Sequence, residues 1–225
     1  MTSLTPDALS HSTDLHEIYD RLFTAFGPQH WWPAASRFEM IVGAILTQNT
    51  SWKNVEKALL SLKEESALNP VALRKMPQSK LARLIRSSGF FNIKALRLKA
   101  WITFLFDEYG GSLDRMFAEE GDLLRKKLLF VKGLGPETVD SILLYAGNYP
   151  SFVIDAYTRR IFSRHQMLDP KSPYETIQHF FMERLPVDPT LYNEYHALIV
   201  TLAKQFCKKE PECAECPLNY LFELS

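Results

Sequence analysis

The chain has 225 residues, of which 46% are hydrophobic and 23% charged, a balance that excludes a wholly disordered protein. No apolar run approaches the roughly 20 residues that cross a bilayer, and residues 1–20 lack the basic start and apolar stretch of a secretory signal, so we expect a cytosolic protein with no membrane association. The 26 basic residues balance the 26 acidic ones, and net charge therefore indicates no polyanionic partner, leaving only local basic patches to consider.

Helical periodicity runs along most of the chain, whereas alternating strand-like runs are nearly absent. The first strong pattern covers 38–46, where apolar residues recur at i, i+3, i+4 and i+7. A second follows Pro136 and stops near Gly147. Further helices are predicted at 54–64, 78–87, 94–109, 120–130, 157–165, 173–184 and 191–206. The sequence therefore predicts an all-α fold.

Residues 120–147 predict two helices joined by the tight turn Gly133-Leu134-Gly135, with Lys132 just before it. The two glycines permit positive φ or close approach by a ligand, and Pro136 suits the first position of the second helix. Such a turn directs unpaired backbone amides outward, which favours a phosphate. An ordinary connection between two helices is the alternative.

The segment VKGLGPETVDSIL, followed closely by FVIDAYTRRIFSR, resembles the signature of the helix-hairpin-helix DNA glycosylase superfamily that includes endonuclease III. The resemblance extends to 38–59, 88–99 and 195–207, and so covers most of the chain. It implies a two-lobed, all-α glycosylase fold with the active-site cleft between the lobes. One lobe would be 39–149, with the hairpin at about 120–147. The other would combine the N-terminal segment 1–38 with the C-terminal lobe 150–225.

The resemblance assigns the catalytic carboxylate to Asp155, which follows the apolar residues 152–154. Cleavage of a glycosidic bond builds positive charge on the sugar, and a fixed carboxylate stabilises that charge. The alternative is that Asp155 only caps the helix beginning near Ala156. Both roles are compatible, because a cap position also favours the ionised form.

Glu137 occupies the position where bifunctional relatives carry a lysine that forms a Schiff base with the deoxyribose. A carboxylate forms no imine, and Lys132 precedes the turn. We therefore expect base release without AP-lyase activity.

Trp31, Trp32 and Pro33 precede the first core helix, as in the 3-methyladenine DNA glycosylase III subgroup, and the resemblance implies that they line an aromatic base pocket. Aromatic faces attract a cationic alkylated base. Core packing or an interface anchor is the alternative. The resemblance also implies that Gln48 fills the gap left by a flipped base and that Phe90 wedges beside its partner. Phe90 and Phe91 are alternatively buried core aromatics.

Cys207, Cys213 and Cys216 resemble the four-cysteine loop that holds a [4Fe–4S] cluster in many relatives. Phe222 stands where the fourth cysteine belongs, and the first spacing is one residue short. We therefore expect a remnant loop without iron. A labile three-cysteine cluster and a cluster with a fourth ligand from outside the motif are the alternatives. His196 is expected to pack in the core or behind a ligand rather than to bind metal. No cofactor is expected for the chemistry itself.

Together these features predict a monofunctional DNA N-glycosylase for alkylated purines, chiefly 3-methyladenine, acting on damaged double-stranded DNA as a monomer in a bacterial-type cytosol or nucleoid. One alternative is an endonuclease III-like glycosylase for mismatched thymine, uracil or an oxidised base. Another is a DNA-binding module without catalysis, and a third is a short Cys-rich zinc-binding interaction domain.

Overall fold

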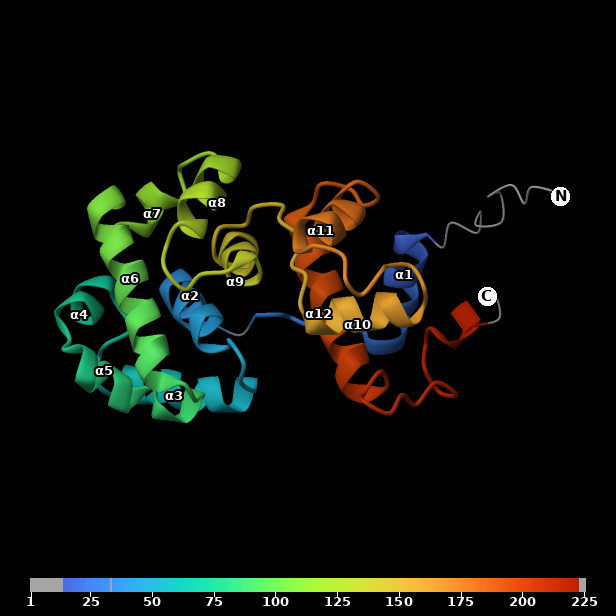
Figure 1. Cartoon of the computed structure of the whole chain (residues 1–225), viewed down its shortest axis with the longest axis horizontal. Coiled ribbons are helices and arrows are strands. Elements are labelled where there is room, and N and C mark those ends of the chain that lie inside the picture. The colour runs from blue at the N-terminus through green and yellow to red at the C-terminus, as the bar shows by residue number, and fades with distance from the viewer. Residues whose placement is uncertain (1–13, 33, 223–225) are drawn as a thin grey trace, which may run out of the picture. The chain divides into compact units, whose positions relative to one another are not determined.

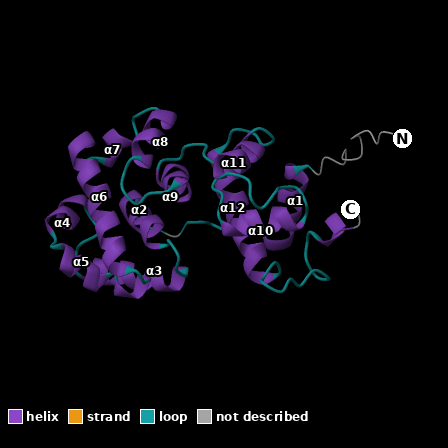
Figure 2. Ribbon diagram, in the orientation of Figure 1, coloured by secondary structure: helices purple, strands orange, loops and turns teal. Residues whose placement is uncertain are grey.

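The computed structural model describes residues 14–32 and 34–222, and within them every regular element is helical (Figures 1 and 2). This confirms the predicted fold class. In these same ranges no helix has the length and apolar character needed to cross a membrane. The chain divides into two compact units, with boundaries at Trp31/Trp32 and Val153/Ile154. The sequence had suggested a central lobe of 39–149.

One unit combines the N-terminal helix with the C-terminal part of the chain. Its helices are α1 (Leu15–Phe26), α10 (Ala156–Arg164), α11 (Tyr174–Met182), α12 (Pro189–Gln205) and the short η3 (Asn219–Phe222). Helix α12 is central, because both α1 and α10 pack against it. The buried hydroxyl of Tyr195 donates to the carbonyl of Leu15 at 2.9 Å and so connects α12 to α1.

The other unit spans 32–153. Its helices are α2 (Arg37–Leu46), α3 (Trp52–Glu64), α4 (Pro70–Lys75), α5 (Gln78–Leu84), η1 (Arg86–Ser88), α6 (Phe91–Tyr109), α7 (Leu113–Met116), α8 (Gly121–Leu129), α9 (Pro136–Ser141) and the π-helical η2 (Ile142–Ala146). The predominantly apolar α2 packs against α3, α6 and η2. Nearly all of its side chains are buried, which explains its position at the centre of this core.

The hairpin of this unit rests on a buried ion pair. The Arg125 guanidinium of α8 donates to both carboxylate oxygens of Asp140 in α9, at 2.7 and 2.9 Å. Asp140 is fully buried and also accepts from the hydroxyl of Ser151 at 2.7 Å. A bidentate pair of this kind fixes the angle between its two helices, since both side chains are held in one geometry.

Candidate functional site

Asp155 is the N-cap of α10. Its Oδ1 accepts from the backbone amide of Thr158 at 2.7 Å and from the hydroxyl of the same residue at 3.0 Å. The cap predicted as an alternative is therefore present. It uses only one of the two carboxylate oxygens, and Oδ2 instead faces the imidazole Nε2 of His196 at 3.6 Å.

The surroundings of Asp155 favour its ionised form. Burial raises the pKa of this carboxyl, but His196 and the two hydrogen bonds from Thr158 together hold the pKa below its usual value of 3.8. The positive end of the α10 dipole acts in the same direction. Asp155 is thus a carboxylate at neutral pH with one oxygen engaged by the helix and the other beside a histidine.

His196 lies in the middle of α12 and is buried. Sequence analysis placed it in the core or behind a ligand, without a link to Asp155. The missing signal is a tertiary one, because α10 and α12 meet only after folding. A histidine on an otherwise apolar helix face was the only hint in the sequence.

The predicted glycine turn lies between α8 and α9. Gly133 has φ +93°, a conformation that strongly favours glycine, and an added Cβ would clash with the side chain of Arg97. Gly135 has an ordinary φ and open space around its Cβ position, so no steric contact within the protein demands glycine there. Lys132, Gly133 and Gly135 are exposed, whereas Leu134 is buried and anchors the turn. The turn can therefore be approached closely from outside.

Gln48 lies against this hairpin. Its Nε2 donates to the carbonyl of Gly133 at 3.2 Å and to the Thr138 hydroxyl at 2.9 Å. Its Oε1 accepts from the Arg97 guanidinium. Sequence analysis selected Gln48 but missed Arg97, whose contact joins residues distant in sequence.

Phe90 is exposed by 65% and adopts a left-handed conformation with φ +44°. The alternative that Phe90 is a buried core residue is wrong, whereas Phe91 does pack against the core. A bulky residue at positive φ is unusual, and such strain concentrates at functional sites. Together with Gly89, also at positive φ, it forms a turn that carries an apolar side chain in solvent.

Trp31 and Trp32 belong to different units. In the unit of residues 32–153, the Trp32 ring contacts the rings of Trp52, with centroids 4.9 Å apart, and Tyr145, at 5.2 Å. In the unit that contains Asp155, the Lys204 ammonium lies 5.7 Å from the centroid of the Trp31 ring. Pro33, the third residue predicted for the pocket, lies outside the described residues.

Comparison with known proteins identifies the family. Residues 42–187 match the model of the HhH-GPD superfamily, described as base excision DNA repair proteins. The chain belongs to this superfamily. It is 47% identical to a protein of Methanocaldococcus jannaschii that is named as a DNA repair glycosylase, over 91% of this chain and 94% of the relative. It is also 28% identical to endonuclease III of Thermotoga maritima, over 81% of this chain and 80% of the relative.

Solved structures give the same family. The structure is similar to that of the H. pylori 3-methyladenine DNA glycosylase bound to 1,N6-ethenoadenine, with TM-score 0.76 and 31% identity over 85% of this chain and 98% of the other. A non-covalent endonuclease III–DNA complex has TM-score 0.79 at 22% identity, with 92% of each chain covered, and supports the fold alone. The chain is thus a base excision DNA glycosylase of the HhH-GPD superfamily.

Glu137 lies in the first turn of α9 and is exposed. Its backbone carbonyl accepts from the Ser141 hydroxyl at 2.7 Å, one helical turn on. Glu137 thus lies at the start of the second helix of the hairpin, at the place where the family resemblance assigns the lyase lysine.

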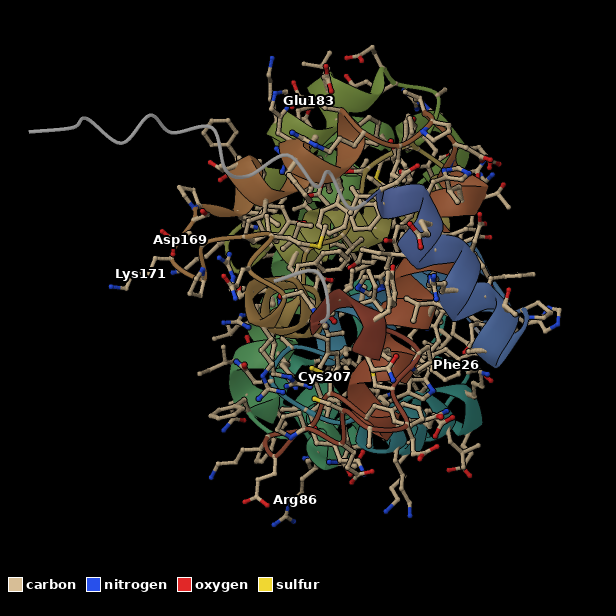
Figure 3. The ribbon with its side chains drawn as sticks, turned by 90° about the vertical axis from the view of Figure 1, so that its right-hand side faces the viewer. Phe26, Arg86, Asp169, Lys171, Glu183 and Cys207 are labelled. Carbon is tan, nitrogen blue, oxygen red and sulfur yellow. The ribbon has the colours of Figure 1, made fainter. Side chains whose placement is uncertain are left out.

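The three cysteines line a cavity of about 340 Å³ together with Arg164, His165, Glu212 and apolar side chains. Figure 3 labels Cys207, which lies just after the end of α12. Arg164 donates to the sulfur of Cys207 at 3.2 Å and to the carbonyls of Lys208 and Lys209 at 2.6 and 3.0 Å. Within residues 14–32 and 34–222, no three His, Cys, Asp or Glu side chains are arranged to hold a metal ion. This donor set does not fit a cubane cluster, which needs four thiolates.

Proposed function

We propose that this glycosylase hydrolyses the N-glycosidic bond of alkylated purines in double-stranded DNA, with 3-methyladenine as the principal substrate. The observation that carries the chemistry is the partly buried, capped carboxylate of Asp155 beside His196. The choice of substrate is supported by the similarity to the H. pylori 3-methyladenine glycosylase, whose solved complex contains an ethenoadenine.

The proposed reaction begins when the damaged nucleotide leaves the base stack, because its glycosidic bond is inaccessible in the duplex. As the bond between the sugar and the base breaks, positive charge develops on the sugar. Oδ2 of Asp155 stabilises that charge and orients the attacking water, while Oδ1 stays engaged with Thr158. The pKa of Asp155 lies below its usual value, so the negative charge is present before the substrate binds.

The leaving base needs little help from a general acid. N3-alkylation makes the adenine cationic, which weakens its bond to the sugar and makes the departing base neutral. This chemistry is consistent with a site built around one carboxylate. Trp31 and Trp32 each carry an aromatic ring of the kind whose face attracts a cationic base.

We propose that the enzyme is monofunctional. Strand cleavage by the lyase route needs an amine that attacks the sugar carbon and forms an imine. Glu137 offers a carboxylate at the corresponding position. The expected product is an intact strand that carries an abasic site.

We further propose that the protein acts without an iron–sulfur cluster and as a monomer, in a bacterial-type cytosol or nucleoid. The cluster proposal rests on the incomplete ligand set of Cys207, Cys213 and Cys216. The contacts from Arg164 supply protein hydrogen bonds to the same loop.

The test is release of free base from methylated DNA and from duplexes that carry uracil, a T·G mismatch or an oxidised base. Strand breakage is scored before and after alkali. The proposal predicts release of 3-methyladenine and strands that break only after alkali. Release solely from another lesion would replace the substrate, and breakage without alkali would contradict the monofunctional assignment. Tight duplex binding without release from any substrate would exclude the proposed enzyme activity.

A further inference from the structure

Lys94 and Arg97, one helical turn apart on α6, contact the segments that carry Gln48 and Phe90, the two residues predicted to probe DNA. Lys94 is almost fully buried, although lysine normally remains exposed. Its Nζ donates to the carbonyls of Leu46 at 2.9 Å and Ser88 at 2.6 Å. Leu46 ends α2, just before Gln48, and Ser88 ends η1. One ammonium therefore holds the segments that lead to Gln48 and to Phe90.

Burial lowers the pKa of Lys94 to about 8, and the nearby Arg97 contributes to the shift. Below that pH the ammonium is charged and its two bonds to carbonyl oxygens are charge-assisted. These carbonyls lie at helix ends, where backbone acceptors lack partners within the helix. Lys94 thus donates a hydrogen bond to a carbonyl at the end of each of two helices.

Arg97 lies one turn further along α6 and makes the second connection. Its aliphatic stem packs where a Cβ of residue 133 would stand, which is one reason that position requires glycine. Its guanidinium donates to Oε1 of Gln48, while Nε2 of the same amide donates to Gly133 and Thr138. Both ends of the Gln48 amide are therefore held before DNA is present.

We propose that Arg97 is a positioning residue that preorganises Gln48 against the hairpin, so that gap filling by Gln48 and docking of the hairpin on DNA occur in one geometry. Glutamine loses considerable rotamer freedom when it is immobilised on binding. Fixing its side chain in the free protein removes that cost from the binding step. Lys94 fixes the main chain on which this arrangement depends.

The inference rests on the proposed role of Gln48 but not on the alkylpurine substrate. Binding to an abasic duplex therefore tests it separately from base release. The probes are a duplex with one tetrahydrofuran abasic site and an intact duplex of the same sequence. Binding of each duplex is measured by fluorescence anisotropy at several salt concentrations. The variants are Arg97→Met, which keeps the stem over Gly133, Gln48→Ala, and the two combined. Arg83→Met, at an exposed position on α5, is the charge-matched control.

We expect Arg97→Met to weaken binding of the abasic duplex by about 5- to 10-fold and binding of the intact duplex by less than about twofold. In the Gln48→Ala background the same substitution should cost less than about twofold, because the residue it positions is gone. Arg83→Met should leave the preference for the abasic duplex unchanged.

Four results would overturn the proposal. Equal weakening of both duplexes, with a salt slope reduced by about 1, would make Arg97 a phosphate contact instead. Additive losses in the double variant would show that Arg97 acts independently of Gln48. Tighter abasic binding by Arg97→Met would mean that the bonds restrain Gln48 rather than prepare it. Unchanged abasic binding by Gln48→Ala would mean that Gln48 does not fill the gap.

Discussion

The glycine hairpin and the C-terminal cysteine loop are held in shape in different ways. The hairpin keeps each residue that its geometry demands, from the positive φ of Gly133 to Pro136 at the start of α9. The loop has an incomplete ligand set, and its backbone is held by Arg164 from α10. The comparison teaches that the two segments are shaped by different means. The hairpin is shaped by its own glycine and proline, whereas the cysteine loop is held by hydrogen bonds from a side chain of another helix.

The support beneath the hairpin should be the most costly to remove. Arg125→Met leaves the buried carboxylate of Asp140 with Ser151 but without its cation. We expect the free energy of unfolding to fall by about 3–5 kcal/mol, as is typical when one member of a buried ion pair is removed. Urea denaturation measures the loss. A loss below about 1 kcal/mol would mean that the pair does not hold α8 against α9.

Gly133→Ala tests the turn itself. The positive φ and the clash with Arg97 should lower the free energy of unfolding by about 1–3 kcal/mol. Thermal unfolding and duplex binding are measured together, and binding should weaken as well. Gly135→Ala is the matched control, since its Cβ meets no atom within 4 Å inside the protein. It should preserve stability while it hinders close approach of a phosphate. If the two alanines destabilise equally, the account of the turn is wrong.

Arg164→Met tests the other side of the comparison. The variant loses the hydrogen bonds to the carbonyls of Lys208 and Lys209, and we expect the free energy of unfolding to fall by about 1–2 kcal/mol. Limited proteolysis should cut the loop after Cys207 faster than in the parent. Unchanged proteolysis would show that another contact holds the loop.

Cys213→Ser should have the smallest effect, because Cys213 is only partly buried and belongs to no set of three metal-binding side chains among the described residues. We expect a change in the free energy of unfolding within about 0.5 kcal/mol, as at other positions without special contacts. Purified parent protein should contain no stoichiometric iron by metal analysis. A large loss of stability together with bound iron would restore the cluster and break the comparison.

Sequence reasoning succeeded where a local pattern determines the structure. The all-helical fold follows from the spacing of apolar residues in α2, α6 and α12, and the hairpin from its glycines. The short α4 and α7 were not predicted, since four to six residues are too few to establish a period. The longer α1 was also missed, although its buried Leu15, Ile18 and Leu22 follow helical spacing. Contacts between distant segments could not be predicted either, notably His196 with Asp155 and Arg97 with Gln48. They depend on which helices pack together, which spacing within one helix does not reveal.

The central claim is that the carboxylate of Asp155 carries out the chemistry, and single-turnover release of 3-methyladenine by the parent and by Asp155→Asn tests it most directly. Asparagine is also a good N-cap, so it should preserve α10 and the melting temperature while it removes the negative charge. We predict a rate at least about 10³-fold lower for the variant, in line with the loss of a group that stabilises transition-state charge. A well-folded Asp155→Asn that releases the base within about tenfold of the parent rate would contradict the account.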